Sequence, residues 1–264
     1  MLLALVAGAA VVLLRDGGDE TQARRDAVAA YIVQVNQTQQ ALIVELESVS
    51  RAYRELQLKA KPVPGQLEKV AAAEQTLRKL RGRIAALSTP GEARKLRASL
   101  LQLVDLQSGL AHEVAGMVRY IPVQAAENRK LAAETKKLRD GLQGAKTGAG
   151  QRVAFETYRT ALLTSVGLLE RATAPDVLEP SRTGEIARLE RLAGLARQLG
   201  RALETQQAQD VDRLFPRFVQ TSSSTGTTPT ERRAVIAFNR RLRAITEQRT
   251  AVTKERAQLD ISLR

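Results

Sequence analysis

The chain has 264 residues, of which only 3% are aromatic, and its 41 Lys and Arg outnumber its 28 Asp and Glu to give a net charge of +13. It contains no Cys, which excludes disulfides, thiol nucleophiles and Cys-ligated metals. A pI near 10.6 predicts attraction to polyanions such as anionic lipid or acidic wall polymer, or else a surface that is basic only for solubility.

The chain begins with an uninterrupted apolar run, MLLALVAGAAVVLL, followed by RDGGDE. The run is shorter than the roughly 20 residues that span a bilayer, and it lacks both a basic leading segment and a clear cleavage site. We interpret residues 1–15 as a membrane anchor or uncleaved signal whose first residues are missing, with a cleaved signal as the alternative. The flanking charges give little orientation signal, and an N-terminal anchor before one soluble domain favours a body outside the cytoplasm.

A long helix is predicted from Asp19 to about Lys59. Its apolar residues recur at a spacing of seven, with a second set four residues after the first. The two sets are Val28, Val35, Leu42, Val49 and Leu56, and Ile32, Gln39, Leu46 and Tyr53. Alternating steps of four and three indicate a helix that packs lengthwise against other helices.

Two further helices are predicted before the middle of the chain. KPVPG at 61–65 ends the first helix, and an apolar stripe over 70–87 then forms an antiparallel hairpin with it. The third helix starts near 89–92, where Thr, Pro, Gly and Glu follow one another, and continues to about 142 with a kink or break at Pro122. GLQGAKTGAG, the glycine-rich stretch that follows, is the best internal boundary.

The second half is predicted to hold three helices. They lie at about 155–169, at 186–203 with an end near 211–216, and from Pro229 onward. Residues 220–230, QTSSSTGTTPT, read as a flexible polar loop.

β-Branched residues appear singly at helical spacing, so no strands are expected. The predicted fold is therefore all-α. It is an elongated, antiparallel, coiled-coil-like bundle of about six helices plus an N-terminal apolar anchor helix, with halves at 19–143 and 151–264.

No constellation of residues predicts catalysis, a cofactor or a metal. His112 is the only histidine, so a His-based metal site within one chain is excluded, and we expect His112 on the surface. Glu45 and Glu47 are two residues apart on a helix and face different sides. The glycines after 140 lack the Lys-Ser/Thr ending of a phosphate loop. An enzyme is the least supported class.

The remaining candidates for a functional site are polar residues that lie in the apolar stripes, or seams, of the predicted helices. Gln39, Gln107 and Asn128 are expected to fix the register between helices, or else to line a polar ligand pocket. Arg249 and Arg256 interrupt the stripe of the last helix, where they either extend to the bundle edge or contact a partner.

The densest basic cluster is Arg240, Arg241 and Arg243, a candidate contact for a partner or an anionic surface. Aromatic residues lie in seams away from the arginines, so nucleic-acid binding is not expected.

Four segments of the sequence are similar to segments of other proteins: MLLALVAGAAVVLL, YIVQVNQTQQ, AALSTPGEARKLRASLLQL and FNRRLRAITEQRTAVTKERAQLD. With them the chain resembles uncharacterised membrane-anchored or exported all-helical proteins of high-GC Gram-positive bacteria. The resemblance implies a location and a fold class but no activity.

We expect a non-enzymatic structural or interaction module of the cell envelope, held at the membrane by its N-terminal helix. Its helix seams would join a protein partner or a second copy as a homo-oligomer. One alternative is a ligand-binding bundle resembling extracytoplasmic sensor domains, and another is a cytoplasmic coiled-coil scaffold.

Overall fold

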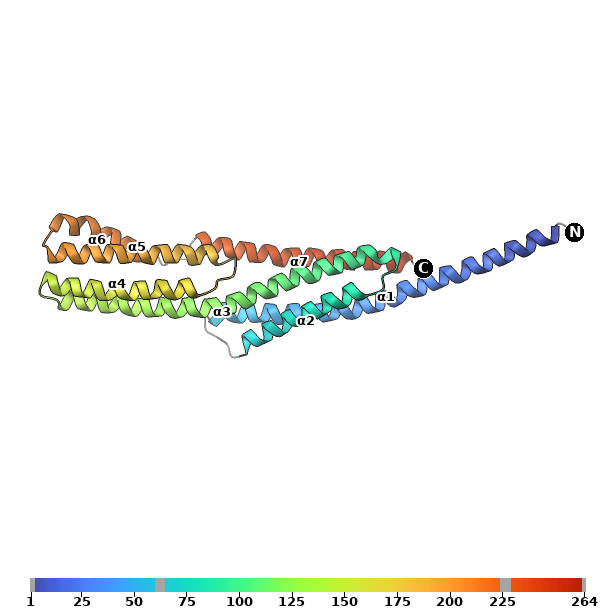
Figure 1. Cartoon of the computed structure of the whole chain (residues 1–264), viewed down its shortest axis with the longest axis horizontal. Helices are drawn as coiled ribbons and strands as arrows, with labels where there is room; N and C mark the ends of the chain where they lie inside the picture. Colours follow the sequence, from blue (N-terminus) through green and yellow to red (C-terminus); the bar gives the residue numbers. More distant parts are fainter. Residues whose placement is uncertain (1–2, 60–64, 224–228, 263–264) are drawn as a thin grey trace. The chain divides into compact units, whose positions relative to one another are not determined.

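The computed structural model describes the backbone of residues 3–59, 65–223 and 229–262, and side chains within 20–56, 65–223 and 235–261. The chain described in these ranges is all-α, with seven α-helices, one short 3-10 turn and no strand (Figure 1). The elements are α1 Leu3–Lys59, α2 Gln66–Ala86, η1 Gly91–Ala93, α3 Arg94–Gly144, α4 Gly148–Arg171, α5 Glu179–Glu204, α6 Ala208–Ser223 and α7 Pro229–Ser262. The all-α prediction is confirmed, with one more helix than expected in the bundle.

Apolar residues at a spacing of seven form the buried face of several helices. In α1 they are Val28, Val35, Leu42, Val49 and Leu56, in α2 Val70, Leu77 and Ile84, and in α7 Phe238, Ile245, Val252 and Leu259, none more than 9% exposed. Each such side chain contributes roughly 1.5–3 kcal/mol by leaving water. This burial stabilises the helices, because helical propensity alone is weak.

The chain packs into two compact units. Unit 1 comprises the described residues of 1–51, 69–112 and 241–264, and unit 2 those of 52–68 and 113–240. The helices α1, α2, α3 and α7 therefore each contribute residues to both units. The predicted halves, 19–143 and 151–264, group the residues differently, and a division of the chain there into separate domains stays a prediction.

Within unit 1, side-chain contacts join α3 both to the preceding helix α2 and to α7, which is far from it in the sequence. Ser99 on α3 donates its hydroxyl to Glu255 on α7 at 3.0 Å, and its carbonyl accepts from Gln248 Nε2 at 2.9 Å. Arg81 on α2 pairs with Asp105 on α3 at 2.6 Å. These contacts place α2 and α7 against α3.

Within unit 2, α4 and α5 pack antiparallel. Arg152 near the start of α4 pairs with Glu204 at the end of α5, at 2.6 Å. At the other end, Arg182 near the start of α5 donates to the carbonyl oxygens of Leu169 and Glu170 at 3.1 and 3.2 Å, and so satisfies the last turn of α4. The α6 helix closes the core with Leu214 and Phe218.

The expected separate anchor helix is absent, because α1 is continuous from Leu3. Gly17 and Gly18 do not end it: a helical glycine costs only about 1 kcal/mol, whereas a proline would cost about 3 kcal/mol. Among the helices as far as the structure describes them, none is both long enough and apolar enough to cross a bilayer. The side chains of 1–19, on which the anchor interpretation depends, lie outside the described residues.

Two prolines lie inside helices. A kink or a break was predicted at Pro122, and the break is wrong because α3 continues through this residue. The α6 helix likewise continues through Pro216, where a helix end was predicted. A proline removes one backbone hydrogen bond. Buried neighbours such as Val118 and Phe218 offset that cost by packing in the core of unit 2.

The end of the fifth predicted helix was placed too late. The α5 helix ends at Glu204, and Gln206 follows with a positive φ of 55°. Gln206 N donates to Leu203 O at 3.4 Å and Gln207 N to Ala202 O at 2.9 Å, which is the Schellman ending of a helix. This turn lets α6 fold back on α5 as the additional helix.

The predicted flexible loop at 220–230 is wrong at both ends, because α6 extends to Ser223 and α7 begins at Pro229. The hydroxyls of Ser222 and Ser223 donate to backbone carbonyls one turn earlier, which suits serines to the end of a helix. Residues 224–228 lie outside the described part of the chain.

Candidate functional site

The seam amide Gln39 and the seam arginine Arg256 meet in unit 1. Arg256 Nη1 donates to Gln39 Oε1 at 3.1 Å and to Asn36 Oδ1 at 2.8 Å. Two amides of α1 therefore accept hydrogen bonds from one guanidinium of α7, and no carboxylate of the described residues forms an ion pair with it. This arrangement agrees with a register role for Gln39 and gives Arg256 polar partners inside unit 1.

Of the other two amides predicted to lie in the core, Gln107 is buried and Asn128 is not. Gln107 is 2% exposed, and neither amide atom has a hydrogen-bond partner among the described residues. Asn128 is exposed, so its predicted place in the seam is wrong. Leu131 and Leu138 continue the buried face of α3 in unit 2, and Asn128 instead lies on the wall of a cavity.

The predicted basic contacts lie on the surface of α7. Arg240, Arg241, Arg243 and Arg249 are all exposed, whereas Arg256 is half-buried. The Arg241 guanidinium lies beside Gly109 of α3, 3.4 Å from where a Cβ would stand. The first three follow almost directly on one another, so they concentrate positive charge on one short stretch of helix.

His112 is exposed as predicted, with its Nδ1 3.3 Å from Glu74 Oε1. In the described part of the chain, no group of three or more His, Asp or Glu is placed to hold a metal ion. Neither His112 nor Glu74 lines the cavity described below.

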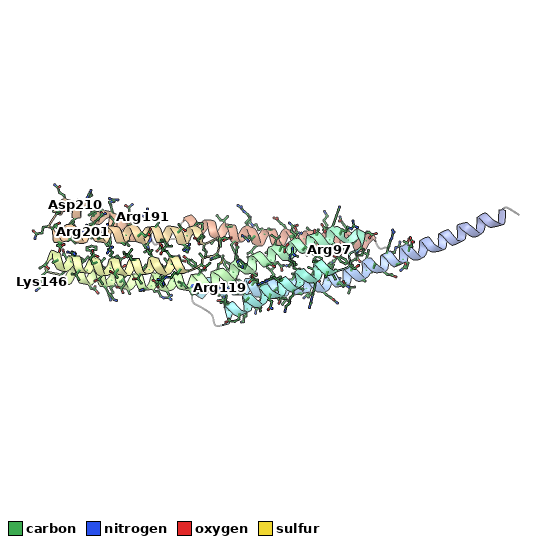
Figure 2. The ribbon with its side chains drawn as sticks, in the orientation of Figure 1. Arg97, Arg119, Lys146, Arg191, Arg201 and Asp210 are labelled. Atoms are coloured by element: carbon green, nitrogen blue, oxygen red, sulfur yellow. The ribbon has the colours of Figure 1, made fainter. Side chains whose placement is uncertain are left out.

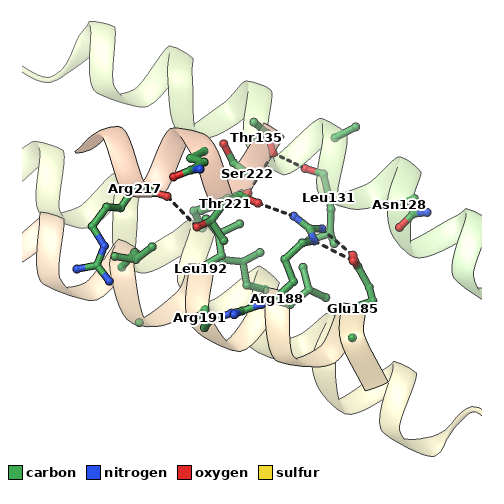
Figure 3. A pocket seen from close by; sticks show the side chains of 18 of the residues that line it. Asn128, Leu131, Thr135, Glu185, Arg188, Arg191, Leu192, Arg217, Thr221 and Ser222 are labelled. Carbon is green, nitrogen blue, oxygen red and sulfur yellow. Dashed lines mark hydrogen bonds and ion pairs between the residues drawn. The ribbon is translucent and has the colours of Figure 1, made fainter. Parts of the chain in front are cut away.

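A cavity lies in unit 2, between α3, α4, α5 and α6 (Figure 3). It has a volume of about 1190 Å³. Four leucines of the core are among its lining residues, and none of them is more than 8% exposed: Leu131, Leu162, Leu189 and Leu192. The rest of the lining includes amides, hydroxyls and guanidinium groups.

An ion pair forms part of the polar lining. Arg188 donates through Nε and Nη2 to both carboxylate oxygens of Glu185, at 2.8 and 2.6 Å, and through Nη1 to Thr221 O at 3.1 Å. The Glu185 carboxylate raises the pKa of the Arg188 guanidinium. The three groups link α5 to the last turn of α6 and fix one wall of the cavity.

A second polar contact lies deeper in the same cavity. The Tyr158 hydroxyl of α4 lies 3.2 Å from Thr135 Oγ1 of α3, which in turn donates to Leu131 O at 2.8 Å. Burial raises the pKa of Tyr158. Tyr158 also packs edge to face on Phe218 of α6, with ring centroids 6.1 Å apart. The hydroxyl therefore stays neutral and holds α3 against α4.

Two further arginines, Arg191 on α5 and Arg217 on α6, line the cavity and are exposed (Figures 2 and 3). The three arginines and one glutamate of the lining carry a formal charge of +2. Because Glu185 forms an ion pair with Arg188, the remaining positive charge of the lining lies on Arg191 and Arg217. Among the described residues, neither guanidinium has an ion-pair partner.

The sequence did not reveal this cavity. Its arginines lie on two helices whose contact was not predicted, and α6 itself was missed. The one local signal was the Glu185–Arg188 spacing, which is common on any exposed helix. The chain matches no protein-family model, no curated protein and no solved structure.

Proposed function

We propose that the chain is a non-enzymatic structural or interaction module of the cell envelope, tethered to the membrane by residues 1–15 with its body outside the cytoplasm. The observation that supports it best is the burial of apolar residues at a spacing of seven along α1, α2 and α7. Side chains at that spacing hold helices together lengthwise and leave their outer faces for partners.

The basic stretch of α7 supplies a surface for anionic lipid or wall polymer. Arg240, Arg241 and Arg243 are exposed, and each arginine near an anionic membrane surface contributes about 1 kcal/mol at physiological salt. Three of them together favour attachment by about 3 kcal/mol, which is roughly a hundredfold in partitioning.

Cosedimentation of the full chain with vesicles tests this proposal. The N-terminal run would bind neutral and anionic vesicles alike, so the measured quantity is the excess bound to phosphatidylglycerol vesicles over phosphatidylcholine vesicles. We expect that excess to disappear at high salt, because ions screen surface charges. We also expect the triple change of Arg240, Arg241 and Arg243 to Gln to remove most of it.

A matched control removes three charges elsewhere. Lys136, Arg139 and Lys146 are exposed and lie on α3 or just after it. Their triple change to Gln should leave most of the excess in place. Equal losses for the two triple variants would contradict a specific role for α7, and no excess at all would contradict the surface attraction.

The cavity of unit 2 favours a second candidate function, a ligand-binding bundle of the extracytoplasmic sensor type. Amides, hydroxyls and guanidinium groups in a concave site can fix the orientation of a small molecule. Both candidates can hold for one protein, because the cavity lining and the basic stretch of α7 share no residue.

A further inference from the structure

We propose that the outward face of α1 pairs with the same face of a second copy of the chain, with the two helices antiparallel. The inference rests on the proposed interaction role, in which outer helix faces are left for partners, and it names the partner for one such face.

This face lies on the side of α1 opposite its buried apolar residues. Its middle consists of Val33, Gln37, Gln40 and Val44, which follow one another at steps of four, three and four. All four are exposed, the two valines by 56% and 55%. Such steps form a straight stripe along a helix, as in the seam of two packed helices. The outer stripe is therefore a second seam of α1, and it stays exposed in the described part of the chain.

The same spacing continues from the outer stripe to a charged residue at each end. Asp26 lies at the N-terminal end and Arg51 at the C-terminal end, and both are exposed residues of unit 1. Asp26 accepts a hydrogen bond from Gln22 of the same helix at 3.0 Å, and neither Asp26 nor Arg51 forms an ion pair with another described residue. At 1.5 Å per residue the two charges are roughly 38 Å apart along α1, so they cannot pair within one chain.

The outer stripe is complementary to itself when a second copy runs in the opposite direction. With the two-fold axis between residues 38 and 39, Val33 of each copy faces Val44 of the other, and Gln37 faces Gln40. The valines then cover each other's exposed surface. The amides both donate and accept, so they can hydrogen-bond across the pair.

The charged residues select the antiparallel direction. In the same register Asp26 of each copy faces Arg51 of the other, so opposite charges meet at both ends of the pair. Between them Glu47 faces Ala30, a small residue that leaves its carboxylate in contact with water. A parallel pair would instead place Asp26, Glu47 and Arg51 each beside its own counterpart, and like charges at a contact disfavour that arrangement.

The composition of the outer stripe also sets the strength and the geometry of the pairing. Only two valines per chain are apolar, which is typical of a weak and transient contact. Antiparallel pairing places the N-terminal ends of the two α1 helices at opposite ends of the pair. Copies tethered to one membrane therefore pair only where α1 lies along the membrane surface.

Reversal of the end charges tests the pairing, by sedimentation equilibrium of the full chain in a non-ionic detergent. Asp26→Arg gives a chain with a positive group at both ends of the stripe, and Arg51→Asp a chain with a negative group at both ends. Each should self-associate about tenfold or more weakly than the unchanged protein, because repulsion replaces attraction at two places. Mixed together, the two variant chains should associate like unchanged chains, since opposite charges meet again at each end.

Matched controls make the same charge changes on another helix. Asp140→Arg and Lys136→Asp each change an exposed residue of α3. Each variant should self-associate like the unchanged protein, and mixing the two should give no gain. Circular dichroism should show the same helix content for all variants, because every changed side chain is exposed.

Single cysteines report the direction of the pair, because the chain has none of its own. A Val33→Cys chain mixed with a size-tagged Val44→Cys chain should form mainly the mixed disulfide under oxidising conditions. In an antiparallel pair, two cysteines at the same position would stand about 16 Å apart along the helix, too far for a disulfide. A parallel pair would form disulfides between like chains instead.

The outcomes that would overturn the inference are distinct. If the charge-reversed chains self-associate like the unchanged protein, or gain nothing on mixing, the outer stripe is not the contact. Disulfides mainly between like chains would contradict the antiparallel direction. A chain that stays monomeric would show that a second copy is not the partner, and protection of the Val33→Cys thiol by anionic vesicles would then assign the stripe to lipid.

Failure of the pairing would be distinguishable from failure of the proposed function. The charge-reversed chains keep Arg240, Arg241 and Arg243, so their excess binding to phosphatidylglycerol vesicles reports on the basic stretch of α7 separately.

Discussion

Arg256 on α7 donates a hydrogen bond to Gln39 on α1 at 3.1 Å, although 217 residues separate them in the sequence. Both residues interrupt otherwise apolar stripes. A guanidinium left without a partner at a helix contact is costly, and each register of α7 against α1 that misaligns the two would leave it so. The contact therefore selects one register among the several that the seven-residue spacing of the seams permits.

A double-mutant cycle measures that contact. Gln39→Ala and Arg256→Ala should show a coupling energy of about 0.5–1.5 kcal/mol in urea unfolding, because one hydrogen bond joins them. Arg249→Ala, at an exposed position of the same helix, should change stability by less than about 0.5 kcal/mol and show no coupling to Gln39. A coupling energy of zero for the first pair would mean that the hydrogen bond is not formed in solution.

Gln107 is a buried amide whose replacement we expect to change stability. Its amide is buried, and neither polar atom has a hydrogen-bond partner among the described residues. Gln107→Leu should therefore raise the free energy of unfolding by about 1–2 kcal/mol, because the cost of an unsatisfied buried group disappears. Gln107→Ala should lower it, since a cavity then replaces the side chain. Destabilisation by Leu as well would reveal a polar partner for the amide.

Gly148 allows the start of α4 to approach the end of α5. A Cβ at this position would clash with Leu203 O, a backbone atom that cannot move aside by rotating. Gly148→Ala should destabilise the protein by about 1–3 kcal/mol, as overpacking usually does. Gly184→Ala on α5 meets open space and should be neutral or stabilising by up to about 1 kcal/mol. Thermal unfolding of both variants checks this, and equal melting temperatures would contradict the close approach.

Burial raises the pKa of Tyr120 from 10.0 to about 12, which makes stability depend on pH in alkali. The unfolded state loses its proton near pH 10 while the folded state keeps it, so the folded state binds more protons and stability falls as pH rises from about 10 to about 12. The loss from this residue is on the order of 3 kcal/mol, and it is absent below pH 9.

Tyr120→Phe isolates this contribution. Tyr120 is only 1% exposed, and its hydroxyl has no hydrogen-bond partner among the described residues. Removal of the hydroxyl should therefore be neutral or stabilising at pH 7. Urea unfolding between pH 9 and 12 should then show a shallower decline. The slope will not vanish, because burial also raises the pKa of Tyr31, Tyr53 and Tyr158. An unchanged slope would show that Tyr120 reaches water.

Gln206 occupies the position of the α5 ending where glycine is usual. Its φ of 55° strains a residue that has a Cβ, and the turn hydrogen bonds hold it there. Gln206→Gly should therefore raise the free energy of unfolding by about 1 kcal/mol, while Gln206→Val should lower it. Chemical denaturation of the two variants settles the matter, and destabilisation by Gly would contradict the turn geometry.

Periodicity predicted the parts of the fold that depend on repeated apolar burial. The spacing of Val28, Val35 and Leu42 was enough to identify the inner face of α1, because a helix that packs lengthwise must repeat its apolar residues. Local signals failed where tertiary packing outweighs them. Pro122 lies inside a helix despite its backbone cost, and the turn at Gln206 lacks the glycine that would have marked it.

The candidate site was less predictable than the fold. Asn128 was selected as a seam amide, yet its exposed position on the cavity wall depends on how α3 faces α5 and α6. Arg191 and Arg217 belong to helices whose contact has no sequence signature, and in a chain with 41 basic residues no single arginine is conspicuous. Gln39 and Arg256 were each selected from the sequence as unusual residues of an apolar stripe, but only the folded structure pairs them.

The most direct test of the account is a cross-link between α1 and α7, which the absence of cysteine makes simple to read. A short bismaleimide should join Asn36→Cys to Arg256→Cys within one chain, because Arg256 Nη1 lies 2.8 Å from Asn36 Oδ1 in the unchanged protein. The control pair of Asn36→Cys with Arg249→Cys, two helical turns away, should react far more slowly. Equal rates for the two pairs, or cross-links only between chains, would contradict the register of α7 on α1.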